Sequence, residues 1–266
     1  MPIYRILLLA AAVATESWTL PQGLSVKDEG PRTYRFVVDY TSSDTRGQIV
    51  HRQRLSGDYT RGLPGGDVRW TNVSNAEADG ATTPLPEGQK REYMEGLRYR
   101  KNLADVSGSM KPDFFKNFPP AAVQERNLVW DSEMIELFGQ AEFEHLRLNE
   151  PYHLAPEQDV KMPGIGTFQN RDVQLTWTGR SRRNGQDCAV IGYTAFFNRL
   201  DVATPGMTLV GRSHYWGQIW VSLTTKQIEY ATLFEDVLGE LKFAGQDKAQ
   251  IIDVFRSGVF EPISSR

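Results

Sequence analysis

The sequence predicts a mainly β protein of the α+β class: a curved antiparallel sheet or half-open β-barrel with one or two helices packed on it. Three observations support this prediction. Apolar and polar residues alternate along 173–178 and again along 215–223, which is the period-two pattern of a half-buried strand. Asn184-Gly185 joins two β-rich runs, and Asn-Gly is the strongest short signal for a hairpin turn. A strong helical pattern before the C-terminal region occurs in one stretch, 131–138.

The length and composition exclude several classes of protein. The chain has 266 residues, with 30 basic and 33 acidic side chains and a formal net charge of −3. This near balance lacks the basic footprint of nucleic-acid-binding proteins, so we expect no nucleic acid as a partner. A single cysteine, Cys188, excludes an internal disulfide framework and a Cys-rich zinc site. The length suits one large β domain, and we expect a single β-rich domain over 32–266.

Residues 1–14 have the pattern of a secretory signal peptide. Arg5 precedes an apolar run of nine residues, Ile6 to Ala14, which ends in the small-residue pattern Ala-Val-Ala. We therefore expect an exported protein, periplasmic or extracellular; the alternative is a buried N-terminal strand or helix. No stretch approaches the roughly 20 apolar residues that span a bilayer, so we expect no transmembrane segment and a soluble mature protein.

The N-terminal half is predicted to consist of short strands joined by turns and one long loop. Residues 15–31 are polar, contain Pro and Gly, and are expected to form a flexible lead-in. Residues 75–90 lack a hydrophobic period, which indicates a surface loop or an interdomain linker. The segments with β character in this half are 34–40, 46–55, 68–73 and 93–99.

One helix is predicted in the middle of the chain. Apolar residues at 134, 135, 137 and 138 follow Asp131, which is a suitable N-cap, and Gly139 is a suitable stop. Trp130, just before this cap, is placed to act as a hydrophobic staple against the first turn. If Gly139 is tolerated inside the helix, the helix reaches His145.

The C-terminal half is predicted to form two hairpins, one turning at Asn184-Gly185 and one at 224–226. The predicted strands are 173–178, 188–196, 215–223 and 228–234. Residues 249–255 fit a helix or a strand equally well. The resulting plan resembles the half-open β-barrels of periplasmic lipoprotein carriers. The resemblance concerns layout alone and involves no shared motif, so it implies no function.

No local motif for a metal or a cofactor is present. None of the histidines has a spacing that binds metal locally; they are His51, His145, His153 and His214. Gly164 and Gly166 match two glycines of a dinucleotide fingerprint, but Gln169 replaces the third. The stretch from Gly211 to Tyr215 resembles a nucleophile elbow but lacks its last glycine and leads into a strand instead of a helix. We therefore expect no cofactor and no metal.

Tryptophans give the clearest indication of a binding site. Trp216 and Trp220 share one face of their strand, opposite Ile219. If the aliphatic face meets the core, the tryptophans are covered either by another protein layer, as in a central strand, or by a ligand. Apolar and sugar-like ligands are held by aromatic walls with few polar groups. We predict that Trp177, Trp216 and Trp220 line a ligand site.

The leading functional hypothesis is a non-catalytic exported protein that binds its ligand in the concavity of the sheet. The ligand is predicted to be a lipid or another apolar or amphipathic small molecule, or else a cell-envelope partner. A second hypothesis is a secreted, hydrolase-like enzyme with a dispersed acid–base site, for which His214, Glu229 and Asp131 are the candidates. A third is a purely structural β module whose own side chains fill the sheet. A cleft that holds a carboxylate or histidine with a strongly shifted pKa favours the enzyme.

Overall fold

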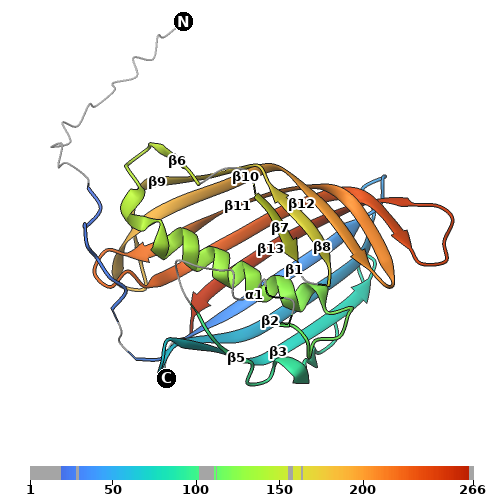
Figure 1. The fold of residues 1–266 in the computed structure, drawn as a ribbon, viewed down its shortest axis with the longest axis horizontal. Coiled ribbons are helices and arrows are strands. Elements are labelled where there is room, and N and C mark those ends of the chain that lie inside the picture. Colours follow the sequence, from blue (N-terminus) through green and yellow to red (C-terminus); the bar gives the residue numbers. More distant parts are fainter. Residues whose placement is uncertain are drawn as a thin grey trace, which may run out of the picture.

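The computed structural model describes residues 19–27, 30–101, 111, 113–154, 158–162 and 164–263. The predicted signal peptide, residues 1–14, lies outside the described residues. The described chain forms one large antiparallel sheet of 13 strands, strongly curved but not closed, with one α-helix on its concave face (Figure 1). This architecture confirms the predicted fold class. No described helix is long and apolar enough to cross a membrane.

The strands occupy both halves of the chain, and the main helical segments lie between them. The strands are β1 (Arg32–Ser43), β2 (Ile49–Leu63), β3 (Asp67–Asp79), β4 (Gln89–Lys90), β5 (Arg98–Arg100), β6 (Pro151–His153), β7 (Gln158–Met162), β8 (Gly166–Asn170), β9 (Asp172–Arg183), β10 (Gln186–Thr204), β11 (Met207–Ser222), β12 (Ile228–Phe243) and β13 (Gln250–Pro262). The helical segments are α1 (Val123–Glu136), the π-helix η3 (Leu137–Ala141), and the short 3-10 helices η1 (Glu92–Met94) and η4 (Phe143–His145).

Strands β1 and β13 join the two halves of the sheet. The strand order is β4-β3-β2-β1-β13-β12-β11-β10-β8-β7, with β5 beside β3 and β9 between β10 and β6. Tyr34 pairs with Pro262 at one end of the β1–β13 ladder, and Ser43 pairs with Asp253 at the other. The segment 249–255 is therefore strand from Gln250 onward: it pairs with β12 from Gln250 and with β1 from Asp253, where the backbone is satisfied on both sides.

The predicted hairpin turn at Asn184-Gly185 is confirmed. Strand β9 ends at Arg183 and β10 begins at Gln186. Asn184 and Gly185 have φ values of 49° and 76°, as a type I′ turn requires. The loop predicted at 75–90 is shorter than expected, because β3 continues to Asp79 beside β2.

The helix begins earlier than predicted. It starts at Val123, its N-cap residue Ala122 makes no side-chain capping bond, and Asp131 lies inside it. The predictions of Asp131 as N-cap and Trp130 as staple are therefore wrong. Asp131 is 8% exposed and forms an ion pair with Arg256, so its carboxylate serves a tertiary contact instead of a cap.

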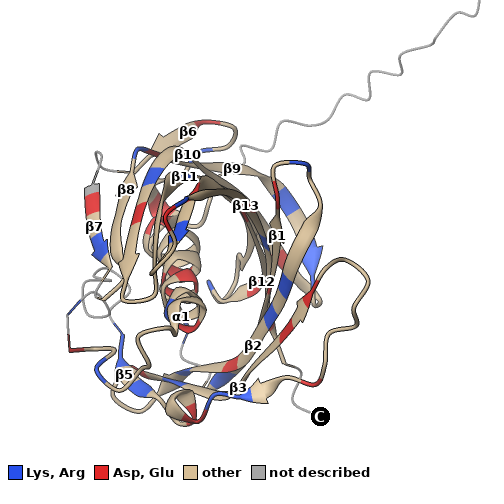
Figure 2. Cartoon of the chain, turned by 90° about the vertical axis from the view of Figure 1, so that its right-hand side faces the viewer, with Lys and Arg blue, Asp and Glu red and all other residues tan. Residues whose placement is uncertain are grey.

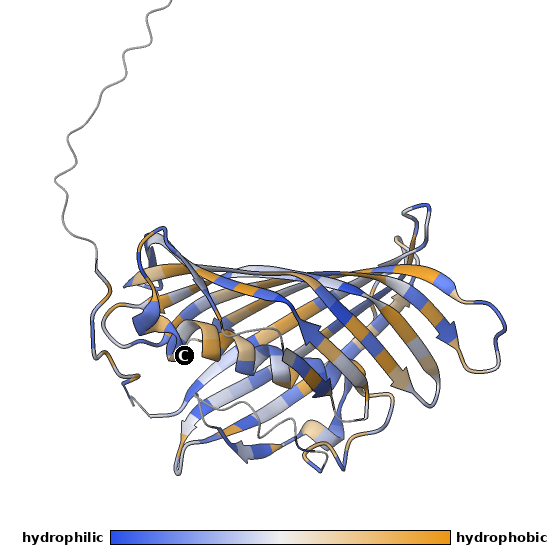
Figure 3. Cartoon of the chain, turned by 45° about the horizontal axis from the view of Figure 1, so that its top comes forward, coloured by the Kyte–Doolittle hydropathy of each residue, from blue (hydrophilic) through white to orange (hydrophobic). Residues whose placement is uncertain are grey.

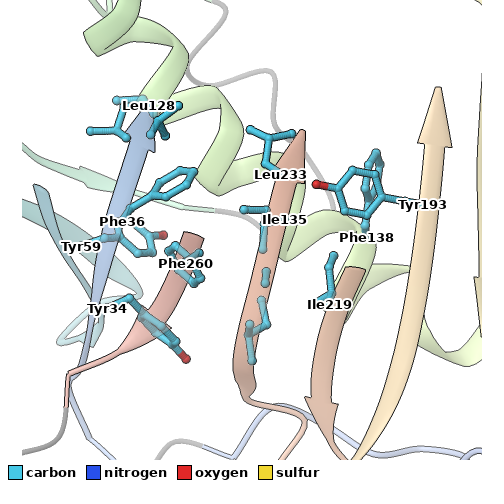
Figure 4. Close-up of a cluster of buried hydrophobic side chains, with 14 of the residues drawn as sticks. Tyr34, Phe36, Tyr59, Leu128, Ile135, Phe138, Tyr193, Ile219, Leu233 and Phe260 are labelled. Atoms are coloured by element: carbon cyan, nitrogen blue, oxygen red, sulfur yellow. The ribbon is translucent and has the colours of Figure 1, made fainter. Parts of the chain in front are cut away.

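The helical segments α1 and η3 and the core side chains occupy the concave face of the sheet. Figure 2 shows α1 inside the curve of the sheet, and Figure 4 shows helix residues such as Leu128 and Phe138 beside sheet residues such as Phe260 and Tyr193. All four of these side chains are at most 3% exposed. Gly139 lies against β11, where an added Cβ atom would be 3.0 Å from the Ile219 side chain.

The residues that lead into β1 also contact the sheet. Leu20 is 3% exposed and belongs to the main core. The backbone N–H of Lys27 donates a hydrogen bond to the carbonyl of Thr225 at 3.0 Å. The described part of the 15–31 segment therefore packs on the turn between β11 and β12.

Candidate functional site

The three predicted tryptophans lie on two different faces of the sheet. Trp216 and Trp220 are half-buried on the convex face, because Ile219 between them points into the core. Trp177 pairs across the ladder with Ile191 on the concave face. It is 1% exposed, and its indole N–H donates a hydrogen bond to the Gly179 carbonyl at 2.7 Å. The structure therefore brings Trp216 and Trp220 to one surface and seals Trp177 in the core.

A groove of about 700 Å³ opens on the convex face, across β9, β10, β11 and β12. Figure 3 shows hydrophobic and hydrophilic residues alternating along these strands, as expected when both faces of a sheet have distinct roles. Trp216 lines this groove, whereas Trp220 lies beyond it and packs on Tyr230 at 5.3 Å between ring centroids. The lining residues are Gln174, Thr176, Thr178, Gly192, Tyr193, Thr194, Phe196, Trp216, Gly217, Gln218, Thr232 and Phe234.

Small side chains create the depression. Gly192 pairs with Thr176 on one side and with Gln218 on the other. A Cβ atom added at Gly192 would meet the Thr178 methyl group at 3.5 Å, an ordinary contact distance. The space above Gly192 therefore accommodates an added methyl group without a backbone change.

Three aromatic rings form a compact cluster beside the depression. Trp216 of β11 stacks with Phe234 of β12 at 5.9 Å and 27°. Phe234 in turn stacks with Phe255 of β13 at 6.3 Å and 21°. Phe255 is 41% exposed and its ring centroid is also 6.3 Å from that of Trp216, so the three rings form one compact apolar patch on the convex face.

The polar groups of the groove are hydroxyls and amides, and none of its lining residues is charged. The Thr178 hydroxyl donates to the Val190 carbonyl at 3.1 Å, and the Thr232 hydroxyl accepts from the Gln218 backbone N–H at 3.1 Å. Within the described part of the chain, the exposed Gln218 side chain makes no hydrogen bond to the protein. Its amide is therefore available as both donor and acceptor.

The candidate acid–base residues do not form one site. His214 lies on the convex face and packs on Phe197 at 5.4 Å between rings. Asp131 lies in the concave core with Arg256. Glu229 is bound by Arg32 through two hydrogen bonds of 2.9 and 2.6 Å. Among the described residues no group of three or more His, Cys, Asp or Glu side chains is placed to hold a metal ion.

A buried ion cluster, which sequence analysis missed, attaches α1 to the sheet. Arg256 of β13 bonds to Asp131 of α1 and to Glu235 of β12. Glu235 also accepts a hydrogen bond from the Ser213 hydroxyl at 2.5 Å. Burial raises the pKa of Asp131 to about 6; Arg256 opposes this shift and Glu235 adds to it. No sequence signal connects these residues, because they come from four separate elements.

Comparisons with known proteins find little similarity. No family model and no curated protein matches the sequence. A similar solved structure is that of lipovitellin, described in terms of its lipid–protein interactions, with a TM-score of 0.47 and 15% sequence identity. The match covers 90% of this chain and 26% of lipovitellin, so the chain spans about a quarter of that protein. At this level of similarity the likeness carries no functional argument.

Proposed function

We propose that this chain is an exported, non-catalytic binding protein that takes an amphipathic ligand in the groove on the convex face. The observation that carries the proposal is the half-buried Trp216, stacked on Phe234 beside the open space above Gly192. The concavity predicted as the binding surface is occupied by α1 and core side chains, and the pocket that remains beside Arg61, Lys101 and Glu136 is smaller, about 250 Å³. The convex groove is therefore the better-supported location for the ligand.

Energetics favour a role for this groove in binding. Exposed aromatic surface is costly in water, and clustered apolar patches on soluble proteins commonly mark interaction sites. Tryptophan and phenylalanine bury large areas when covered, with little loss of side-chain freedom. Because the groove lies on paired central strands, its walls are held in place before the ligand arrives, which lowers the entropic cost of binding.

Two variants with one matched control test the groove. Trp216→Ala removes the stacking wall, and Gly192→Leu fills the depression. Trp220→Ala changes the same residue type on the same face of the same strand, outside the groove. Native mass spectrometry of protein from its exporting host should detect a bound small molecule in the unmodified chain and in Trp220→Ala. The other two variants should show the bare mass.

Two results would contradict the proposal. One is the bare mass in repeated preparations of the unmodified chain, together with no change in tryptophan fluorescence on titration with amphipathic compounds. The other is equal retention of the ligand by Trp216→Ala and Gly192→Leu. Circular dichroism of all variants establishes that the sheet is intact in each case.

Export rests on the signal-peptide pattern of residues 1–14. Expression of the full chain in a secreting host should give a mature protein that begins at Thr15, after the Ala-Val-Ala pattern. N-terminal sequencing of the periplasmic or secreted fraction measures this. Recovery of an uncleaved chain from the cytoplasm alone would count against export.

A further inference from the structure

We infer that the ligand of the convex groove is a neutral saccharide whose ring stacks on Trp216; this inference rests on the proposed function. It combines the charge of the groove, its openness to solvent, and the order of its aromatic and amide groups. Each of these observations selects among the classes of amphipathic ligand.

The absence of charge from the groove selects a neutral ligand. Its lining contains hydroxyl, amide, aromatic and glycine residues and no Lys, Arg, Asp or Glu. A carboxylate or phosphate that enters such a site loses hydration without gaining an ionic partner. Fatty acids, anionic phospholipid headgroups and acidic polysaccharides are therefore disfavoured.

The openness of the groove selects a ligand whose outer side is polar. Sites for apolar molecules typically bury about 70–90% of the ligand surface. This groove is a depression on the outside of a sheet and is open to solvent along its length. An acyl chain lying in it would keep much of its apolar surface in water. A sugar ring instead places hydroxyl groups toward the solvent.

Trp216 and the neighbouring amide of Gln218 match the two sides of a sugar ring. A pyranose has a face of C–H groups, which stack on an indole, and a rim of hydroxyls, which donate and accept hydrogen bonds. Trp216 supplies the stacking surface. The exposed Gln218 amide is two residues further along the same face of β11 and supplies a donor and an acceptor.

The compactness of the aromatic cluster suits a single sugar ring. The centroids of Trp216, Phe234 and Phe255 lie 5.9 to 6.3 Å from one another in a triangle, so a ring stacked on Trp216 lies close to the other two. Phe255 is outside the residues that line the depression and is paired with Asp236 across the ladder. We therefore place the sugar on the Trp216 side of the cluster, over the uncharged lining.

A glycan array probed with the full-length chain tests the inference, with neutral and acidic glycans side by side. Neutral oligosaccharides should bind, and acidic ones should bind weakly or not at all. For the best neutral glycan, calorimetry should show affinity about tenfold or more weaker in Trp216→Ala and clearly weaker in Gln218→Ala. Trp220→Ala should bind as the unmodified chain does. Raising the salt concentration should leave the affinity unchanged, because no ionic contact is involved.

The outcomes separate this inference from the proposed function. If no neutral glycan binds but dispersed monoacylglycerol or phosphatidylcholine vesicles bind in a Trp216-dependent manner, the saccharide inference fails and the groove function stands. If acidic glycans bind best, with strong salt dependence, the inference fails in the same way. If glycans bind equally well to Trp216→Ala and Gly192→Leu, both the inference and the assigned site are overturned.

Discussion

At the scale of residues, the Arg256 cluster places one cation between two buried carboxylates. Asp131 and Glu235 both bond to Arg256, and all three side chains are at most 12% exposed. The cluster therefore carries a net negative charge in a region of low dielectric. Burial of the Asp131 carboxylate is the main physical reason why its pKa is raised to about 6; the Arg256 guanidinium opposes this shift, and the negative charge of Glu235 adds to it.

This raised pKa predicts that the protein becomes more stable on mild acidification. The folded state takes up a proton on Asp131 near pH 6, whereas the unfolded chain takes it up near the ordinary value of 3.8. Between these values the folded state binds more protons, so the free energy of unfolding rises as the pH falls from 7 toward 5. From about 1.4 kcal/mol per pKa unit, the gain from this group between pH 7 and pH 5 is on the order of 1 kcal/mol, and the full gain of about 3 kcal/mol is reached only below about pH 4.

Urea unfolding at several pH values measures this gain, and Asp131→Asn is the control. The variant should lose most of the rise between pH 7 and pH 5. Glu136 does not interfere, because Lys101 and Arg61 outweigh its burial and hold its pKa below the ordinary value. If the difference in unfolding free energy between the variant and the unmodified chain stays constant from pH 7 to pH 5, the prediction is wrong.

At the scale of elements, local signals were sufficient for the turns and insufficient for the helix. Asn184 and Gly185 readily adopt the positive φ values of this turn, so the hairpin can be predicted from the sequence. The helix α1 is buried on several sides, and charged residues such as Glu125 and Glu133 lie among its buried positions. Its sequence therefore lacks a single apolar stripe, and its start at Val123 has no capping side chain. Tertiary ion pairs, which sequence does not reveal, hold it in place.

Close packing of η3 against β11 predicts a second effect on stability. A Cβ atom at Gly139 would lie 3.0 Å from Ile219 and 3.4 Å from Val221. Gly139→Val should therefore lower the free energy of unfolding by about 1–3 kcal/mol through overpacking. Gly206→Val is the control, since an added Cβ atom there meets nothing within 4 Å. Equal effects of the two substitutions on urea unfolding would show that packing at η3 is not the cause.

At the scale of the whole molecule, the sequence predicts which residues share a face but not what each face meets. Alternation correctly placed Trp216 and Trp220 together, opposite Ile219. Whether a face packs on the helix or meets solvent depends on how the entire sheet curves. Trp177 shares the apolar face of its strand with Val173 and Leu175, and its ladder register with Ile191 directs it into the core, whereas Trp216 lies on the face opposite Ile219. The convex groove could not be predicted, because it needs four strands in register.

The joining of β1 to β13 predicts that the sheet unfolds as one cooperative unit. Tyr34 pairs with Pro262, a residue near the other end of the described chain. If one half of the sheet unfolds, the strand of the other half at the β1–β13 junction therefore loses its backbone hydrogen-bond partners. Contacts this distant in sequence also predict slow folding, in milliseconds to seconds.

Gly258→Val tests the cooperativity, because its Cβ atom would lie 3.2 Å from Phe36 and 3.3 Å from Leu233. Hydrogen exchange should show protection lowered equally in β2 and β11, which lie on opposite sides of this junction. Loss of protection confined to β1 and β13 would mean that the two halves unfold separately.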